Sequence, residues 1–149
     1  MKLEVVVLAA GKGTRMRSAL PKVLHLVAGR PMLSHVLESA QKLSPDHIHV
    51  VCGHGAAQVR EYFSHDPTIN WIFQAEQMGT GHAVCQALPD ISTQSTVLVL
   101  YGDIPLILPG TLQRLTDEAR DGSLALLSAS FDNPHGYGRV VRDSDNAIC

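Results

Sequence analysis

Segments typical of buried strands alternate with segments typical of amphipathic helices along almost the whole chain. Residues 3–10 form a nearly continuous apolar run, as expected of a parallel strand that is buried on both faces. Residues 31–43 follow with apolar side chains at helical spacing. The alternation predicts a doubly wound α/β fold with a mostly parallel, Rossmann-like sheet and right-handed crossovers. Further strands are predicted at 47–52, 70–74, 96–100 and 124–131, and further helices at 58–63, 81–88 and 111–120.

Length, charge and cysteine content narrow the class of protein. A chain of 149 residues with 45% hydrophobic residues is long enough for one domain with a hydrophobic core, and its net charge of −2 does not favour nucleic acid as a partner. No apolar run approaches the roughly 20 residues of a membrane helix. The first apolar run could suggest a signal peptide, but it is short and Glu4 interrupts its start, so a buried strand is favoured. Cys52, Cys85 and Cys149 are far apart, which fits reduced thiols in a cytoplasmic protein.

Four loops rich in glycine and polar residues are expected to meet at one edge of this sheet. Doubly wound sheets bind their ligands at the carboxyl ends of the strands. The loops that follow predicted strands are 11–22, 53–55, 74–80 and 101–105. Binding and chemistry are therefore expected at this edge.

The first of these loops combines two glycines with four cations and no acid. It contains neither the GxxxxGK[ST] string of a Walker A loop nor a complete GxGxxG dinucleotide fingerprint, because Met16 takes the place of the third glycine. A glycine-rich anion nest surrounded by cations remains, and so many positive charges favour a polyphosphate over a single phosphate. A solvated basic turn is the alternative interpretation. The four cations are Lys12, Arg15, Arg17 and Lys22.

Two other loops carry groups suited to a nucleotide and a metal. Asp103 comes just after a predicted strand, where a carboxylate could hold Mg²⁺ together with substrate oxygens; a simple strand-ending turn would also favour Asp. The amide of Gln74 or Gln77 could match the imide edge of uracil or thymine, and Gly79 would let the backbone approach the base. An ordinary glycine-rich helix entry would explain the same residues.

A cluster of histidines and one cysteine at 47–54 resembles a zinc site but is disfavoured. Alternate residues of a strand point to opposite faces, so His47 and His49 should point away from Cys52. A tetrahedral site needs all its ligands to converge.

The motifs together resemble a known enzyme family. LAAGKGTRM (8–16) followed by Pro21-Lys22 is similar to the signature loop of the sugar-1-phosphate nucleotidyltransferases. Three further strings make the resemblance to one subgroup of this family more specific: QAEQMGTGHA (74–83), YGDIPLI (101–107) and NPHGYGRVV (133–141). With them, the chain resembles the N-terminal uridylyltransferase (pyrophosphorylase) domain of the bacterial bifunctional N-acetylglucosamine-1-phosphate uridylyltransferase/glucosamine-1-phosphate acetyltransferases.

This resemblance implies a role for each matching position. The nucleotide and its phosphates would be bound by Leu8, Ala9, Ala10, Gly11 and Gly13. Arg15 and Lys22 would be the catalytic cations on the phosphate chain. Uridine would be bound by Gln74, Gln77, Gly79 and Thr80. The sugar phosphate would be bound by Tyr101, Gly102, Asp103 and Gly138, and Asp103 would also be a ligand of Mg²⁺.

The implied reaction converts UTP and N-acetylglucosamine 1-phosphate into UDP-N-acetylglucosamine and pyrophosphate, for cell-wall and lipopolysaccharide precursors. In the family, a second metal-binding Asp, further sugar-binding residues and a trimerising acetyltransferase domain lie beyond the position of Cys149, so residues 1–149 are expected to be an incomplete nucleotidyltransferase domain. A thymidylyl- or glucose-specific enzyme and a non-catalytic nucleotide-binding fragment are the alternatives. A dinucleotide-dependent oxidoreductase is disfavoured by Met16.

Overall fold

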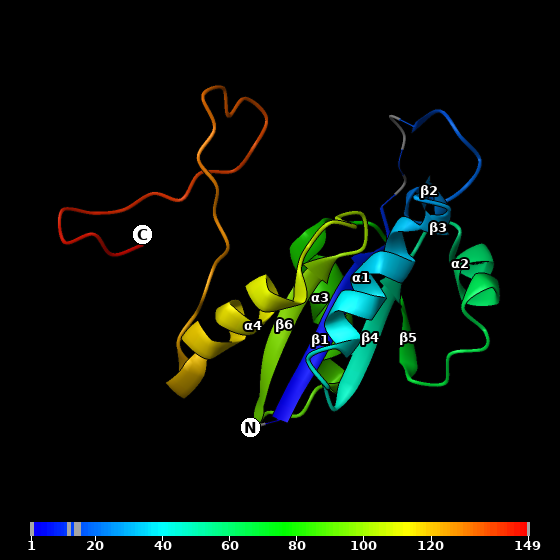
Figure 1. Cartoon of the computed structure of the whole chain (residues 1–149), viewed down its shortest axis with the longest axis horizontal. Coiled ribbons are helices and arrows are strands. Elements are labelled where there is room, and N and C mark those ends of the chain that lie inside the picture. Colours follow the sequence, from blue (N-terminus) through cyan, green and yellow to red (C-terminus); the bar gives the residue numbers. More distant parts are fainter. Residues whose placement is uncertain (1, 12, 14–15, 149) are drawn as a thin grey trace.

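A parallel sheet of four strands forms the centre of the molecule (Figure 1). The computed structural model describes residues 2–11, 13 and 16–148. The strands are β1 (Lys2–Ala9), β4 (His47–Cys52), β5 (Ile69–Phe73) and β6 (Ser95–Tyr101), in the order β5-β4-β1-β6. All three pairings are parallel, which confirms the predicted fold class.

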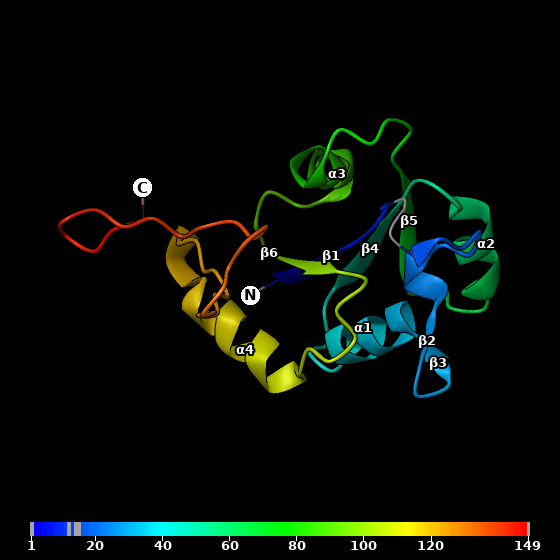
Figure 2. The same ribbon diagram turned by 90° about the horizontal axis from the view of Figure 1, so that it is seen from above.

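Helices cover both faces of the sheet (Figure 2). They are α1 (Met32–Gln41), α2 (Ala56–Tyr62), α3 (Thr80–Ala87) and α4 (Pro109–Glu118). Figure 2 places α1 and α4 on one side and α3 on the other. Each helix overlaps a predicted helical segment, with Pro31 at the N-cap of α1 where a proline needs no amide partner. No helix in the described part of the chain is long and apolar enough to cross a membrane.

The hydrophobic core has two parts, one on each face of the sheet. The larger lies beneath α1 and α4, where Val5 and Val50 of the sheet pack with Leu33 and Leu112. The smaller lies beneath α3 and includes Val6 and Ala87. Because β1 contributes to both, its central residues are fully buried, as the apolar run predicted. Burial of each large aliphatic side chain contributes about 1.5–3 kcal/mol.

The strand order reverses beside β1, and this fixes where a ligand can enter. From β1 the chain adds β4 and then β5 on one side, and β6 later pairs with the other side of β1. In open α/β sheets such a reversal opens a crevice at the carboxyl ends of the two strands concerned. The loops that follow β1 and β6 therefore flank a natural binding crevice.

A buried polar network ties the strands together at the opposite end of the sheet. Glu4 and His49 are each 2% exposed, and His49 Nε2 donates to Glu4 Oε2 over 2.9 Å. The other carboxylate oxygen of Glu4 accepts from Ser95 Oγ at 2.7 Å and from the amide of Ser92 at 3.0 Å. Burial alone would raise the pKa of Glu4, but the hydrogen bonds from Ser95, His49 and Ser92 outweigh it and lower the pKa to about 2.

The positions of His49 and Cys52 do not fit the zinc site considered from the sequence. His49 is engaged with Glu4 on the α3 face, whereas Cys52 packs in the core on the opposite face. Burial raises the pKa of the Cys52 thiol to about 12, so the thiolate that a metal would need is disfavoured. Among the described residues, no three His, Cys, Asp or Glu side chains converge to hold a metal ion.

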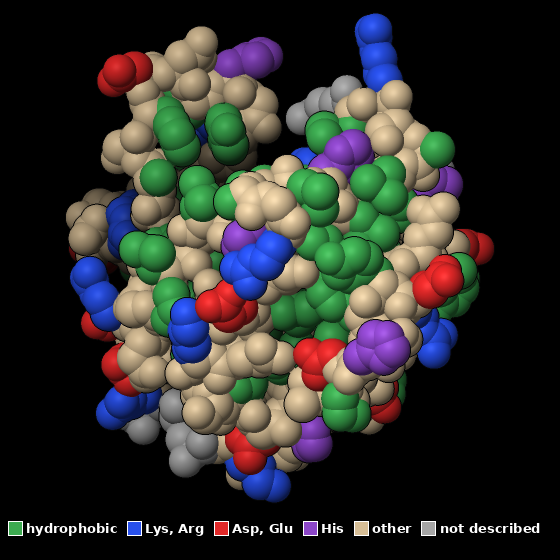
Figure 3. All heavy atoms as spheres, turned by 45° about the vertical axis from the view of Figure 1, so that its right-hand side comes forward, with side chains coloured by type: hydrophobic (Ala, Val, Ile, Leu, Met, Phe, Trp, Pro, Cys, Tyr) green, Lys and Arg blue, Asp and Glu red, His purple; other side chains and the backbone are tan. Residues whose placement is uncertain are grey.

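Charges of both signs are interspersed on the surface (Figure 3). On α1, Glu38 accepts from Lys42 Nζ at 3.0 Å and from Arg30 at 2.9 Å, and both contacts lower the pKa of Glu38. Arg30 belongs to the short hairpin formed by β2 (Leu26–Val27) and β3 (Arg30–Pro31), so these contacts hold the hairpin against α1. Exposed ion pairs of this kind contribute roughly 0–1 kcal/mol each.

The predicted strand at 124–131 is wrong. After the 3₁₀ turn η4 (Arg120–Gly122), residues 123–148 run away from the sheet (Figure 1) and form only one isolated bridge, between Arg142 and Ile148. The segment has the apolar composition of a strand, but a strand also needs a hydrogen-bonded partner. Its large side chains are exposed instead, with Leu124 at 81% and Phe131 at 54%.

Candidate active site

A cavity of about 260 Å³ lies at the carboxyl edge of the sheet, at the reversal between β1 and β6. It is bounded by the ends of these two strands, by the short 3₁₀ helix η2 (Lys22–Leu24) and by the loop from β5 into α3. Every lining residue except Val23 and Ala83 belongs to the set predicted for nucleotide, sugar or metal binding. The lining is Leu8, Ala9, Ala10, Gly11, Lys22, Val23, Gln74, Gln77, Gly79, Thr80, Ala83, Tyr101 and Asp103.

The end of β1 leads directly into the cavity. Ala9 and Ala10 are 3% and 6% exposed, and their small side chains let the chain leave the packed sheet without blocking the space beyond it. Gly13 has a φ of +58°, and a Cβ at this position would lie 2.9 Å from Lys22 Cβ. A glycine is therefore needed for the loop to pass so close to Lys22. Of the predicted cations, Lys12 and Arg15 lie outside the described residues.

An ion pair crosses the cavity. Lys22 Nζ lies 2.6 Å from Asp103 Oδ2, although the two residues are 81 positions apart in the sequence. Their side chains are 39% and 31% exposed, so solvent and ligands can reach both charges. A phosphate entering the cavity would compete with Asp103 for Lys22, and a metal ion would compete with Lys22 for Asp103.

The donor set fits a magnesium ion that takes most of its ligands from substrate and water. Mg²⁺ in phosphate-transfer sites is commonly bound through one or two carboxylates plus phosphate oxygens. Asp103 offers one carboxylate at the wall of the cavity.

The loop between β5 and α3 provides the amide groups of the site. The amide N–H of Gln74 donates to the carbonyl of Cys52 at 2.8 Å, which fixes this loop to the end of β4. The Gln74 side chain is 2% exposed, and its Nε2 contacts His82 Nδ1 at 2.8 Å and the carbonyl of Gly79 at 3.4 Å. The side chain of Gln77 lies close to Gly53. A Cβ added to Gly53 would be 2.8 Å from Gln77 Nε2.

Three predicted residues among those described lie outside the cavity lining: Gly13, which packs against Lys22, Gly102 and Gly138. Gly102 is buried beside the cavity, where its N–H donates to the carbonyl of Leu8 at 2.9 Å and joins the ends of β6 and β1. Gly138 lies in the extended segment 123–148 and does not line the cavity. Because that segment does not pack on the sheet, the structure does not bring Gly138 together with Tyr101 and Asp103.

Three residues at the site were missed from the sequence. Val23 and Ala83 line the cavity, and His82 holds the amide of Gln74. Helical spacing could have identified Ala83, since it comes three residues after Thr80 on α3 and shares its face. The contact between His82 and Gln74 has no comparable signal, because it joins a helix to the preceding loop.

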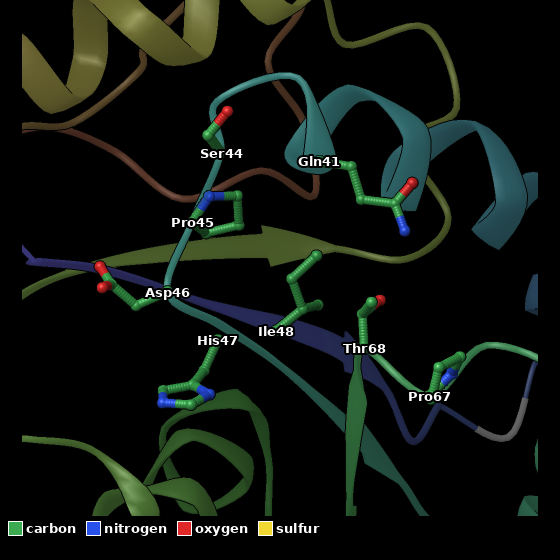
Figure 4. Close-up of a pocket in the computed structure, with 8 residues that line it drawn as sticks. All are labelled: Gln41, Ser44, Pro45, Asp46, His47, Ile48, Pro67 and Thr68. Atoms are coloured by element: carbon green, nitrogen blue, oxygen red, sulfur yellow. The ribbon is translucent and has the colours of Figure 1, made fainter.

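A second, larger cavity of about 390 Å³ lies at the opposite, amino edge of the sheet (Figure 4). Several of its polar groups are already engaged. Asp46 Oδ2 accepts from the amide of Leu3 at 2.8 Å, and Gln41 Nε2 donates to Asp66 at 3.2 Å. In this cavity no cation faces a carboxylate. Its lining is Gln41, Ser44, Pro45, Asp46, His47, Ile48, Pro67 and Thr68.

Comparison with known families identifies the domain. The profile of the MobA-like NTP transferase domain matches residues 5–144. The chain belongs to this family. The match covers β1 from Val5 onward, the glycine-rich loop after it and the whole of the cavity lining.

Relatives with high identity to this MobA-like domain carry a common name. The chain is 58% identical over its whole length to the "Bifunctional protein GlmU" of Pseudomonas syringae pv. syringae. It is 59% identical over 99% of its length to the protein of the same name from Pseudomonas putida. In both cases it spans 32% of the relative, about a third of its length.

Several solved structures have the same fold. HddC from Yersinia pseudotuberculosis, in complex with GMP-PN, matches 98% of this chain and 67% of its own with a TM-score of 0.75 and 22% identity. Rv0371c from Mycobacterium tuberculosis matches 78% of this chain and 59% of its own with a TM-score of 0.66 and 28% identity. A further structure of Rv0371c is a complex with manganese, with 25% identity to this chain over 78% of its length and 58% of that chain, and a TM-score of 0.62.

Proposed function

We propose that this MobA-like domain transfers the uridylyl group of UTP to N-acetylglucosamine 1-phosphate, giving UDP-N-acetylglucosamine and pyrophosphate. The observation that carries the proposal is the cavity at the reversal of the sheet, which gathers the uridine-type amides, the glycine loop and the Lys22–Asp103 pair. The identity of 58% to proteins named GlmU supports the same assignment.

In this reaction, an oxygen of the sugar phosphate bonds to the α-phosphorus of UTP. The bond from that phosphorus to the oxygen bridging to the β-phosphorus breaks, and pyrophosphate leaves with the electron pair. Such transfers need positioning and charge neutralisation more than covalent help from the protein. We propose that Lys22, which lines the cavity, binds phosphate oxygens and stabilises the negative charge that grows on pyrophosphate, and that Arg15 has the same role. Mg²⁺, held by Asp103, would add further neutralisation of the phosphates when bound.

Substrate binding would open the ion pair between Lys22 and Asp103. The ammonium group of Lys22 would turn from the carboxylate to the phosphate chain, and Asp103 would become available to Mg²⁺. Loss of the pair costs little, because both groups are partly exposed and such pairs contribute roughly 0–1 kcal/mol. In the empty site, Lys22 and Asp103 thus neutralise each other. In the loaded site, the phosphates would neutralise Lys22 and the metal ion would neutralise Asp103.

The remaining roles are predictions from the resemblance. Gly11 and Gly13 would bind the nucleotide, and Tyr101, Gly102 and Gly138 would bind the sugar phosphate. We propose the cytoplasm as the location, since Cys52 and Cys85 are free thiols, and cell-wall and lipopolysaccharide synthesis as the use of the product. A homotrimer would form through residues that follow position 149 in longer relatives.

Pyrophosphate release tests this function directly. The chain is incubated with Mg²⁺ and with pairs drawn from UTP, TTP or CTP and from N-acetylglucosamine 1-phosphate or glucose 1-phosphate. We expect the highest kcat/KM for UTP with N-acetylglucosamine 1-phosphate. A higher kcat/KM for TTP or for glucose 1-phosphate would instead identify a related nucleotidyltransferase. UTP binding in calorimetry without pyrophosphate release from any pair would identify a non-catalytic binding module.

A further inference from the structure

The buried amide of Gln74 has its orientation fixed by two neighbours. Nε2 lies 2.8 Å from His82 Nδ1 and 3.4 Å from the carbonyl oxygen of Gly79. A carbonyl oxygen can only accept, so the amide atom that faces Gly79 must be the donor NH₂ group. Rotation of the amide by half a turn would place its oxygen against that carbonyl at the same distance. The Gly79 carbonyl therefore selects one orientation, and His82 is the closer of the two groups that hold it.

This orientation determines what Gln74 can offer to a ligand. Both amide hydrogens point toward protein acceptors, so the group left for a base is the carbonyl oxygen Oε1. Gln74 is part of the cavity wall although its side chain is only 2% exposed. An acceptor at this wall suits a base with a ring N–H on its pairing edge. Uracil and thymine have this group at N3, whereas N3 of cytosine is an acceptor.

We propose that His82 is a positioning residue that determines base specificity, by holding Gln74 with its carbonyl available to the base. This inference deepens the proposed function and rests on a pyrimidine nucleotide entering the cavity. To accept from Gln74, Nδ1 must carry no proton, so the neutral ring carries its proton on Nε2. That nitrogen lies 3.1 Å from Gln86 Nε2, which also donates to the His82 carbonyl at 3.5 Å. The tautomer that Gln74 requires therefore calls for a half-turn of the Gln86 amide, which brings its oxygen to His82 Nε2; Gln86 is only partly buried, whereas Gln74 is fixed in the buried wall.

Cytosine is rejected because its acceptor would meet the Gln74 acceptor. Two facing acceptors leave buried polar atoms without a hydrogen bond, and this penalty is larger than the net gain of a bond that is made. Sites built to hydrogen-bond one partner reject an analogue that lacks the matching group for the same reason. The preference for UTP over CTP should therefore depend on His82, which need not touch the base.

Nucleotide binding in two His82 variants tests the proposal. The dissociation constants of UTP and CTP are measured by calorimetry for the chain, for His82→Leu and for His82→Asn. Leucine removes the acceptor, so the preference for UTP should fall about tenfold or more. Asparagine offers an acceptor oxygen close to the position of Nδ1 and should keep the preference within about threefold of wild type. Cys85→Ala, an exposed change on the same helix, is the matched control.

The outcomes separate this inference from the proposed function. An unchanged preference in His82→Leu, or an equal loss in His82→Asn, would overturn the role of His82. A wild-type chain without preference between UTP and CTP would overturn it as well. A wild-type chain that prefers UTP but makes no UDP-N-acetylglucosamine would instead refute the proposed function and leave the inference intact.

The tautomer of His82 provides a readout that needs no nucleotide. Nitrogen-15 spectra of the histidine side chains distinguish a ring protonated at Nε2 from one protonated at Nδ1. We expect His82 to carry its proton on Nε2 in wild type. A proton on Nδ1 would mean that the ring donates to Gln74, and the proposal would fall.

Discussion

The ion pair between Lys22 and Asp103 is the charged contact at the centre of the site. It spans 2.6 Å inside a cavity whose other lining residues are uncharged, with glycines and apolar, hydroxyl and amide side chains. Neither charge is deeply buried, so the pair does little for folding and is easily exchanged for ligand contacts. At the scale of single residues, we therefore expect Lys22 to act on function and hardly on stability.

Replacement of Lys22 by methionine tests this separation. We expect turnover to fall about 100-fold or more, the usual cost of removing one group that stabilises developing charge. The free energy of unfolding in urea should change by less than about 1 kcal/mol. Lys42→Met is the matched control, because Lys42 also pairs with a carboxylate but lies at the C-cap of α1, outside the cavity lining. Wild-type turnover in Lys22→Met would exclude Lys22 from catalysis.

Single residues at the site could be predicted only in part. Gln74 and Gln77 were equivalent candidates in the sequence, and burial together with the contact to His82 distinguishes them. Lys22 and Asp103 were each predicted, but their direct contact could not be, since 81 positions separate them. Val23 was missed because nothing in its local pattern indicates a cavity wall.

At the scale of elements, the buried carboxylate of Glu4 links three strands and the loop that precedes β6. Glu4 on β1 accepts from His49 on β4 and from Ser95 at the start of β6, and it also binds the amide of Ser92 before that strand. These contacts set the register of β6 against β1 at the end opposite the site. They contribute because the carboxylate is buried and ionised, and hydrogen bonds to a charged group are worth about 1.5–3 kcal/mol.

Acid unfolding of the Glu4→Gln variant measures this contribution. The pKa of Glu4 falls from its ordinary 4.5 to about 2 on folding, so its stabilising effect is complete above about pH 5 and is lost as the pH falls toward 2. At pH 7 we expect Glu4→Gln to lower the free energy of unfolding by about 1.5–3 kcal/mol. Between pH 6 and 3 the variant should lose less stability than wild type. Glu38→Gln is the exposed control and should lower the free energy of unfolding less than Glu4→Gln does.

If the free energy of unfolding of Glu4→Gln fell with pH as steeply as that of wild type, other carboxylates would govern acid unfolding. A cost at pH 7 no larger than that of Glu38→Gln would mean that the buried network adds nothing beyond a surface pair.

The elements themselves were largely predictable, with one informative failure. Strand 47–52 was predicted and is buried on both faces after His47, as expected inside a parallel sheet. Strand 96–100 was also predicted from its apolar run, although β6 is an edge strand in which Val97 and Val99 are 38% and 39% exposed. Residues 124–131 have a similar run but form no strand. The difference lies in pairing, which depends on a distant segment and leaves no trace in the local pattern.

At the scale of the whole molecule, the topology separates two cavities at opposite edges of one sheet. The carboxyl edge has the larger variety of ligand groups, with two opposite charges, the buried amide of Gln74, the exposed amide of Gln77 and a glycine loop. The amino edge has the larger volume, but several of its polar groups bond to neighbouring residues (Figure 4). The reversal of strand order beside β1 explains why the ligand groups meet at the carboxyl edge. The alternation of elements predicted this edge of the sheet, but not the strand order.

Backbone amide chemical shifts recorded during a titration with UTP and Mg²⁺ test the central claim most directly, because both cavities are observed in one experiment. We predict that the largest changes occur at the carboxyl edge, at Leu8, Gly79, Thr80 and Tyr101, while Ser44 and Thr68 at the amino edge stay unchanged. Changes confined to Ser44, His47 and Thr68, or no saturable change at either edge, would contradict a nucleotide site at the end of β1.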